Sequence, residues 1–413
     1  MTHDPVSVVI VSRERPEALL RCLKGLSQQY YPNFETIVVA DPTGTEAVNG
    51  SAFAGLVKLV EFDEPNISVA RNLGIAEAAG EVVAFIDDDA VAEPTWLTHL
   101  VAPFVADAEV MAAGGFVRGR NGISFQWKAQ SVDAMGRTED LKVDETRPSV
   151  LHPTGRRAIK TEGTNMAFRR EVLAEIGGFD PAYHYYLDET DVNLRLAAMG
   201  RATAIVPLAE VHHGYLSNAS RRGNRAPSDL FQIGASQVVF LRKHCPVEHH
   251  ETILKDFAKE QRLRALEHMR DGRLEPRDVR RLMSRLTKGY AAGKSRPLGA
   301  LPRIPRPSEG LRPFPSRAGT APAVVAGRRW NARGLRRRAA ELVAQGQNVS
   351  LFLFSRTGLF HRVRFHPDGY WEQTGGIFGK SDRDQPLFRV TGFGNRLKEE
   401  KLRLAEQRRL FED

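Results

Sequence analysis

Three consecutive aspartates, Asp87, Asp88 and Asp89, follow the apolar run at residues 82–86. A run of that composition is typical of a strand buried in a sheet, and the carboxyl ends of such strands form the edge where open α/β sheets bind ligands. In extended chain Asp87 and Asp89 point the same way, so they could share one divalent cation and the diphosphate that it carries. A helix N-cap cluster is the structural alternative, because an apolar helical stripe begins at Trp96.

The elements that must position these aspartates alternate between strand and helix. Strands are predicted where apolar residues alternate with polar ones or where β-branched residues form a short run. Helices are predicted where leucines recur at helical spacing. The predicted strands cover residues 6–12, 35–40, 57–62 and 81–86, and the helices between them cover residues 16–29 and about 68–79. This order implies parallel strand pairs, so we expect an alternating α/β domain in the first hundred residues.

The pattern continues less regularly beyond residue 100. We predict a strand at 110–117, helices at 168–178 and 188–199, and a strand at 202–207. Residues 120–160 show little periodicity and many polar groups, which indicates long loops or a small excursion over the acceptor side. Residues 229–285 look helical and increasingly charged.

Length and composition indicate one large domain with appendages. The chain has 413 residues, of which 42% are hydrophobic, which is too long for one ordinary domain. Two distant cysteines, Cys22 and Cys245, argue for a reducing compartment and against a disulfide framework. No apolar run reaches the roughly 20 residues that span a bilayer, so a cytoplasmic location is expected.

The net charge of +9 is concentrated in the second half of the chain. Between residues 296 and 338 only Glu309 opposes the arginines at 303, 306, 312, 317, 328, 329, 333, 336 and 337. Such a stretch attracts polyanions, including the anionic inner face of a membrane, and a solvated, disordered linker is the equally good alternative. Prolines make residues 296–327 a semi-rigid linker, and residues 328–413 form a small module with two strand-like stretches around a turn at 367–369 and a basic C-terminal helix.

Four stretches stand out in the first half of the chain: PNISVARNLGIAEAAGEVVAFIDDDAVAEPTWL at 65–97, GTNMAFRREVLAEIGGFD at 163–180, YLDETDVNLRLAAMG at 186–200 and VPLAEVHH at 206–213. In order and spacing they resemble the inverting family 2 glycosyltransferases. The resemblance covers about residues 5–245. It implies a GT-A fold with a mostly parallel sheet flanked by helices, a nucleotide-sugar donor, a divalent cation (Mn or Mg) and inversion at the anomeric carbon.

The expected domain layout follows from this resemblance. A glycosyltransferase domain would cover residues 1–245, a basic helical extension 246–295, the Pro/Arg-rich linker 296–327 and a C-terminal module of unassigned role 328–413. The acceptor would be a hydroxyl of a saccharide or of a lipid-linked molecule.

The resemblance implies roles for the aspartate run and for a histidine. Asp87 and Asp89 would hold the cation, with Asp89 as the more direct ligand, and Asp87 and Asp88 would also lie against the donor. A cation there would neutralise the departing diphosphate. His213 matches a family histidine that can join the metal, with His212 as the alternative ligand.

Three further residues are expected near the donor. Arg71 stands where the family has a basic residue, and its planar guanidinium suits phosphate, although a surface ion pair would explain it too. Arg13, at the end of the first strand, could touch the diphosphate. The family usually has an aspartate directly after the second strand, whereas this chain has Ala40 followed by Asp41, so Asp41 is expected at the nucleotide base or in a turn.

Inversion requires a base that removes the proton of the acceptor hydroxyl. Alignment on Arg195 places Asp188 and Glu189 on the family's Glu-Asp pair, so Glu189 occupies the position of the base. Aspartate is commoner there, and Asp188 and Asp191 remain alternatives. Acidic residues that favour a helix dipole would explain one or two of these carboxylates.

Gly163, Thr164 and Asn165 would line the acceptor side, where glycine permits close approach of a sugar, unless they form an ordinary turn. Three other functions compete with glycosyl transfer. A sugar nucleotidyltransferase should have a glycine-rich loop after the first strand, and SRERPEAL has no glycine. A nucleic-acid-binding protein has charge in its favour but no recognition motif, and a non-catalytic carbohydrate-binding protein would not need every acidic position.

Overall fold

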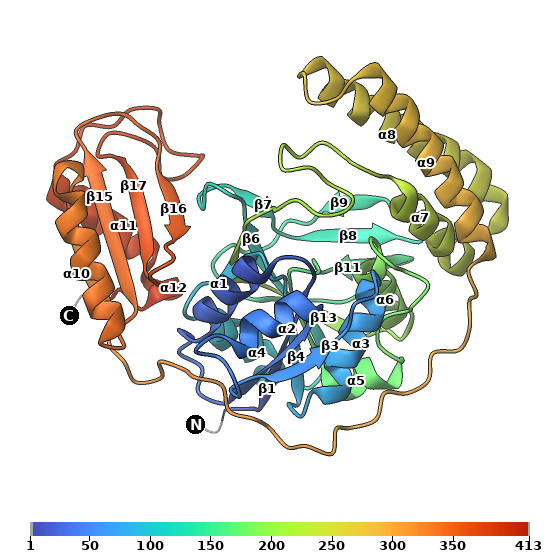
Figure 1. Cartoon of the computed structure of the whole chain (residues 1–413), viewed down its shortest axis with the longest axis horizontal. Helices are drawn as coiled ribbons and strands as arrows, with labels where there is room; N and C mark the ends of the chain where they lie inside the picture. The colour runs from blue at the N-terminus through green and yellow to red at the C-terminus, as the bar shows by residue number, and fades with distance from the viewer. Residues whose placement is uncertain (1–2, 412–413) are drawn as a thin grey trace.

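The structure is a computed structural model that describes residues 3–411 of the chain (Figure 1). Its main sheet has ten strands within that range. They are β1 (Val6–Ser12), β2 (Phe34–Ala40), β3 (Lys58–Glu61), β4 (Val82–Ile86), β5 (Ala90–Ala92), β6 (Val110–Arg118), β7 (Phe125–Trp127), β10 (Ser149–Leu151), β12 (Asn165–Arg169) and β13 (Ala202–His213). The main path runs β10-β13-β6-β12-β4-β1-β2-β3, with β5 paired to β13 and β7 paired to β6.

The expected α/β fold is confirmed, with a sheet that is mixed in direction. Strands β1, β2, β3 and β4 pair in parallel, as strand–helix–strand order requires. β12 runs antiparallel between β4 and β6, and β13 runs parallel to β6. The carboxyl end of β4, which carries the aspartates, therefore lies in the middle of the sheet.

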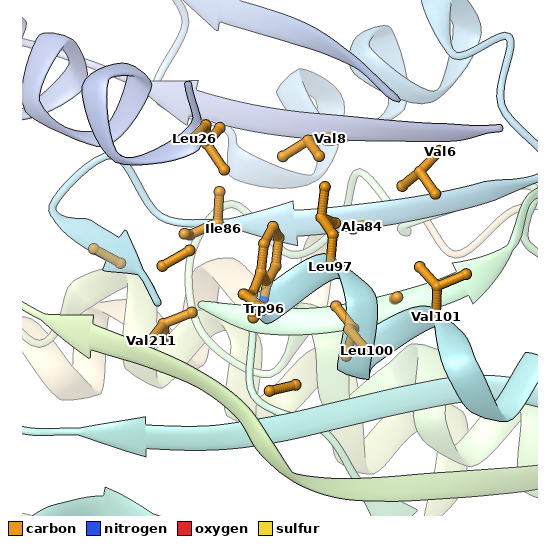
Figure 2. Close-up of a cluster of buried hydrophobic side chains, with 14 of the residues drawn as sticks. Val6, Val8, Leu26, Ala84, Ile86, Trp96, Leu97, Leu100, Val101 and Val211 are labelled. Atoms are coloured by element: carbon orange, nitrogen blue, oxygen red, sulfur yellow. The ribbon is translucent and has the colours of Figure 1, made fainter. Parts of the chain in front are cut away.

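Helices cover both faces of this sheet. They are α1 (Pro16–Leu26), α2 (Pro42–Asn49), α3 (Ile67–Glu77), α4 (Trp96–Ala106), α5 (Arg170–Glu175) and α6 (Asp188–Ala198). Alternation along the strands divides the core, so that Val8 and Ala84 pack with Trp96 of α4 on one face while Val83 and Phe85 face the other cluster. Figure 2 shows α4 pressing its apolar side onto β1 and β4.

Residues 120–160, expected as long loops or a small excursion, contain short strands. β8 (Gln130–Asp133), β9 (Thr138–Asp140) and β11 (Arg157–Lys160) form a separate three-stranded sheet. Strands of three or four residues are too short to show a periodic pattern in sequence, which explains why they were missed.

The expected helical extension at 246–295 contains the short 3-10 helix η1 (Val247–His249), α8 (His250–Arg270) and α9 (Pro276–Ser295), and α7 (Phe231–His244) directly precedes it. α7 and α9 cross closely, because a Cβ at Gly289 would come within 2.2 Å of the Phe231 carbonyl oxygen. Among the described residues, no helix combines the length and the apolarity needed to cross a bilayer.

The linker that follows α9 runs along the outside of the first domain (Figure 1). The expectation of a solvated, disordered segment is wrong for much of it. Phe314 is 3% exposed and its ring lies 5.6 Å from that of Phe34. Arg306 pairs with Glu81 at 3.1 Å, so the first domain supplies acidic partners that the local sequence lacks.

The C-terminal module contains a four-stranded sheet of order β14-β15-β17-β16. Its elements are β14 (Ala323–Arg328), the 3-10 helix η2 (Arg329–Asn331), α10 (Ala332–Ala344), β15 (Val349–Ser355), β16 (Arg362–Phe365), β17 (Trp371–Gly376), α11 (Phe393–Arg403) and α12 (Ala405–Arg408). The expected strands and C-terminal helix are present, whereas β14 and α10 were not expected. β14 lies partly inside the predicted linker, and the many arginines of α10 made it look like disordered basic sequence.

The module packs against the first domain through buried polar contacts. Arg408 of α12 forms two hydrogen bonds of 2.7 Å with Glu93, and both side chains are almost fully buried. Thr95 donates to the carbonyl oxygens of Glu406 and Gln407, and Gln28 donates to the carbonyl oxygen of Gly369. Residues far apart in sequence therefore form one continuous body around the edge of the sheet.

Candidate active site

The aspartate run forms a turn, with the Ala90 amide donating to the Asp87 carbonyl oxygen at 3.0 Å. The expectation that extended geometry aligns Asp87 and Asp89 is therefore wrong, but the turn brings them together with His213 from the end of β13. One ligand atom from each of the three lies within 4.8 Å of the others. The helix-cap alternative does not hold either, because the N-cap of α4 is Thr95.

Contacts around this group fix its orientation. His213 Nε2 lies 3.1 Å from Asp89 Oδ1 and 3.8 Å from Asp87 Oδ2. His213 Nδ1 lies 3.1 Å from Gln126 Oε1, so the ring presents its other nitrogen to the aspartates. Burial disfavours the charged form of His213, but the hydrogen bond and negative charge of Asp89 outweigh it and raise the pKa of His213 above its usual value.

Asp88 points into the interior. It accepts a hydrogen bond from Ser12 at 2.8 Å and pairs with Arg15 at 2.8 Å, and its side chain is fully buried. Burial raises the pKa of Asp88 to about 7, while the Arg15 charge acts in the opposite direction. The structure thus separates Asp88 from Asp87, which keeps a side chain that is 34% exposed.

Arg71 connects the aspartate turn to the acidic start of α6. Its guanidinium, 5% exposed, hydrogen-bonds Asp188, lies 3.8 Å from Asp87 and donates to the Gly163 carbonyl oxygen at 3.2 Å. A Cβ at Gly163 would sit 2.7 Å from Arg71 Nη2, so the glycine makes room for the guanidinium. The surface ion pair considered for Arg71 is replaced by a buried bridge between the two acidic groups.

Strained backbone positions the start of α6. Tyr186 and Leu187 have φ values of +76° and +67°, a left-handed conformation that residues with large side chains rarely adopt. Two consecutive residues keep such a strained backbone conformation only when the packing around them stabilises it. Backbone strain of this kind is concentrated at functional sites. Here it directs Asp188 inward to Arg71 and leaves Glu189 partly accessible.

Glu189 has a side chain that is 15% exposed and lies near a lysine from β11. Lys160 Nζ lies 3.7 Å from Glu189 Oε1 and also pairs with Glu162. Burial lowers the pKa of Lys160, but the charges of Glu162 and Glu189 more than reverse this and raise it. Glu189 therefore lies beside the Lys160 ammonium and next to Asp188.

Asp191 lies in a different environment, a buried ion cluster between α6 and α7. Arg195 Nε, Lys243 Nζ and His244 Nε2 approach its carboxylate at 2.8, 2.7 and 2.8 Å. Burial alone would raise the pKa of Asp191. The hydrogen bond from His244 and the charges of Arg195 and Lys243 outweigh burial and hold that pKa well below its usual range. The structure does not bring Asp191 together with the aspartate turn.

The three residues expected on the acceptor side are in different situations. Gly163 lies over Arg71 at the centre of the acidic groups. Thr164 is buried, and its hydroxyl has no hydrogen-bond partner among the described residues. Asn165 is completely buried, accepting from Trp96 Nε1 at 2.8 Å and donating to two carbonyl oxygens, so it ties strands together and has no free polar atom to offer.

Arg13 and Asp41 lie at the carboxyl ends of β1 and β2. Arg13 is partly exposed and pairs with Asp63 at 3.2 Å. Asp41 caps α2, accepting from the Gly44 amide at 3.3 Å and from the Thr43 hydroxyl at 2.7 Å. The turn alternative considered for Asp41 agrees with this cap, and both residues still border the edge where a nucleotide would lie.

His212 belongs to a second cluster with Glu93 and Glu210. His212 Nε2 lies 2.8 Å from Glu93, while Arg408 and Arg118 pair with Glu93 and Glu210 respectively. Two guanidinium groups already neutralise these carboxylates, so this cluster is a structural junction and His213 is the histidine that faces the aspartate turn.

Sequence reasoning missed Arg15, Lys160 and Glu162. Arg15 follows Glu14, whose φ of +57° turns the chain after β1 and brings Arg15, not Arg13, onto Asp88 and Asp89. Lys160 ends the short β11 strand and Glu162 follows it, and the sequence Lys-Thr-Glu-Gly does not by itself show that these side chains lie beside Glu189.

Comparisons with known proteins found a family match and several relatives. Residues 7–177 match the family described as Glycosyl transferase family 2. The chain is 30% identical over 182 residues to a glucosyl-dolichyl phosphate glucuronosyltransferase of Haloferax volcanii, covering 42% of this chain and 56% of that protein. It is 28% identical over 227 residues to the probable glycosyltransferase YdaM of Bacillus subtilis, covering 49% of each. The chain thus spans about half the length of these two relatives.

Among solved structures, the mannosyltransferase PcManGT from Pyrobaculum calidifontis, in complex with GDP-Man and Mn²⁺, is similar over 73% of this chain and 78% of that one. The TM-score is 0.40 and the sequence identity is 19%.

Proposed function

Because residues 7–177 belong to glycosyl transferase family 2, we propose that this chain transfers a sugar from a nucleotide-diphosphate donor to a hydroxyl group of a saccharide or lipid-linked acceptor, with inversion. The observation that carries the proposal is the pairing of two acidic groups through Arg71. The turn with Asp87 and Asp89 lies on one side of this guanidinium, and Asp188 with its neighbour Glu189 lies on the other.

The residues of the aspartate turn fit a divalent cation. Carboxylate oxygens and a neutral imidazole are suitable ligands for Mn²⁺. Mg²⁺ prefers oxygen ligands, so it would be held mainly by the two carboxylates. Asp87, Asp89 and His213 would hold the ion, and when bound it would supply positive charge to the departing diphosphate. Gln126 and the Leu216 amide, which donates to Asp89 Oδ2 at 2.7 Å, keep these side chains in place without it.

Glu189 is the base in this proposal. An inverting transfer needs a carboxylate on the face of the sugar opposite the leaving group. Glu189 is partly accessible and directly follows Asp188, the residue that Arg71 links to the aspartate turn. Lys160, whose Nζ lies 3.7 Å from Glu189 Oε1, positions this side chain. Asp188 hydrogen-bonds buried Arg71 and also contacts Glu189, so in this proposal it orients the guanidinium and leaves proton removal to its more accessible neighbour.

The donor and acceptor classes rest on weaker support. Arg13 and Asp41 border the donor edge of β1 and β2, which is consistent with a nucleotide there. The Haloferax volcanii relative is named a glucosyl-dolichyl phosphate glucuronosyltransferase, so its name contains a lipid phosphate. Among the candidate acceptors, this supports a lipid-linked one.

A donor panel tests the proposal. The full chain is incubated with nucleotide-diphosphate sugars of each base, with Mn²⁺, with Mg²⁺ or with a chelator, and the release of nucleoside diphosphate is measured. We expect release with at least one donor and its loss in the chelator. NMR of the product anomer then tests inversion. No release from any donor with either cation would reject the proposal.

A further inference from the structure

A pocket of about 600 Å³ opens where the C-terminal module meets the first domain. The first domain lines this pocket with the connection between β6 and β7 and with the segment after β13. The C-terminal module lines it with β16 and with the loop that contains Arg383. Four arginines and no acidic residue line it: Arg120, Arg225, Arg362 and Arg383. This volume lies within the usual range for small-molecule sites.

The four arginines have no acidic partner. Within residues 3–411, no ion pair joins any of them to a carboxylate. Arg383 donates only to the Ser124 hydroxyl at 3.1 Å, and Arg225 lies over the Tyr215 ring at 5.5 Å. All four side chains are exposed, and what sets them apart from other exposed arginines is that they surround one hollow, where an anionic ligand would supply the counter-charge.

The pocket adjoins the aspartate turn. Two of its lining residues contact His213: Gln126 at 3.1 Å, and Tyr215, whose ring centroid lies 5.0 Å from the imidazole. The donor edge at β1 and β2 lies on one side of β4 in the sheet, and the pocket lies on the other side, beyond β12 at β6 and β7. A ligand in the pocket would therefore approach the reacting centre from the side away from the nucleotide.

The module is needed to complete the pocket. The Val363 amide donates to the Asn121 carbonyl oxygen at 2.9 Å, which holds Arg362 beside Arg120. A Cβ at Gly122 would lie 2.3 Å from the Val363 carbonyl oxygen, so the two backbones are in close contact. Without the module, two of the four guanidiniums would be absent.

We propose that this pocket binds a phosphate-type anionic group carried by the acceptor, so that the C-terminal module acts in acceptor recognition. This rests on the proposed function for its reference to an acceptor. Guanidinium forks match phosphate oxygens bidentately, and four of them select a group of high charge density. Exposed apolar side chains on the neighbouring loops, Leu359, Phe360, Leu387, Phe388 and Val390, favour a phosphate attached to a lipid over a soluble one.

Arginine modification tests the pocket without any turnover. The full chain in chelator is treated with phenylglyoxal, with and without inorganic phosphate, and the modified arginines are located by mass spectrometry. We expect phosphate to slow modification of the four pocket arginines and to leave exposed Arg333 and Arg356 unchanged. Equal rates at all six positions with and without phosphate would overturn the proposal. This result does not depend on glycosyl transfer, so failure of the proposed function is recognised separately.

A double variant then identifies the source of the anion. Arg362→Ala/Arg383→Ala is compared with Arg333→Ala/Arg356→Ala for co-sedimentation with phosphatidylglycerol–phosphatidylcholine vesicles and for protection by glycerol 3-phosphate. Loss of two charge-assisted contacts should weaken binding about tenfold or more. Vesicle binding lost only in the first variant supports a lipid phosphate, and protection by glycerol 3-phosphate without vesicle binding supports a soluble one. A raised KM for the donor in nucleoside diphosphate release would assign the pocket to the donor diphosphate and overturn the acceptor role.

Discussion

At the scale of residues, the site depends on two carboxylates of similar type in unlike surroundings. Asp188 is buried under Arg71, whereas its neighbour Glu189 stays partly accessible beside Lys160. The strained backbone of Tyr186 and Leu187 fixes the start of α6, where these two contacting carboxyl groups meet different cations.

Replacement of Glu189 by glutamine should remove proton abstraction and leave the shape of the site unchanged. We expect kcat to fall by about 10²–10⁴-fold, the usual contribution of a general base, with the donor Kd unchanged. Steady-state kinetics and calorimetric donor binding would measure the two effects. Full activity in Glu189→Gln would exclude Glu189 from this role.

His213→Ala should weaken cation binding. Groups that merely support metal ligands change affinity by roughly 10–100-fold, so we expect at least that loss for Mn²⁺ by calorimetry. His212→Ala is the matched control, because His212 bonds Glu93 and should affect stability while Mn²⁺ affinity stays at the level of the unmodified protein. Equal losses in both variants would contradict the assignment of His213.

At the scale of elements, α6 is tied to α7 by the buried cluster around Asp191. Removing one charge from such a cluster leaves its partners buried and unpaired, which costs about 3–5 kcal/mol. Asp191→Asn should therefore lower the free energy of unfolding in denaturant titrations by about that amount, while kcat of the folded fraction stays close to that of the unmodified protein. A stable variant with a large loss of kcat would instead make Asp191 the base.

The partly exposed pair of Asp229 and Arg285 offers a control for that measurement. Surface ion pairs contribute about 0–1 kcal/mol, so Asp229→Asn should change the free energy of unfolding little.

Sequence patterns predicted the elements with strong periodicity and missed the short ones. The strands β1, β2 and β4 and the helices α1 and α6 lie close to their expected bounds, because their apolar residues alternate or recur at helical spacing. Arg15 could not be separated from Arg13, because the choice depends on the left-handed turn at Glu14. The partners of Glu93 and of the linker arginines lie hundreds of residues away, and no local pattern records such pairings.

At the scale of the whole molecule, the linker holds the chain together through Phe314. Its ring packs against Phe34 and Phe53, and truncation of a buried phenylalanine typically costs about 3–5 kcal/mol. Phe314→Ala should release the linker and increase tryptic cleavage at its arginines. Phe360→Ala, at a side chain that is 60% exposed, should leave the cleavage rate unchanged. Equal cleavage in both variants would show that Phe314 does not anchor the linker.

The contact between Glu93 and Arg408 predicts sensitivity to acid. Burial alone would raise the pKa of Glu93, but the charge and hydrogen bonds of Arg408 and His212 lower that pKa to about 2. The unfolded value is about 4.3, so this stabilisation is fully present above that pH and is lost as the pH falls toward 2. Melting temperatures should drop across this window more steeply in the unmodified protein than in Glu93→Gln. Identical pH profiles would contradict this.

Arg408→Ala should cost about 3–5 kcal/mol at neutral pH, because it leaves Glu93 buried without its guanidinium. Arg338, whose pair with Glu341 is more than half exposed, provides the control, and Arg338→Ala should be nearly neutral in the same denaturant titration.

The pairing of Glu93 with Arg408 also sets an order of assembly. The two residues are 315 positions apart, and N-terminal domains fold first as a chain leaves the ribosome. The first domain must therefore form while Glu93 has no guanidinium beside it. Until α12 has been synthesised, Glu93 has His212 but no guanidinium bonded to it, and the cost of burying this incompletely paired carboxyl group favours water around the start of α4.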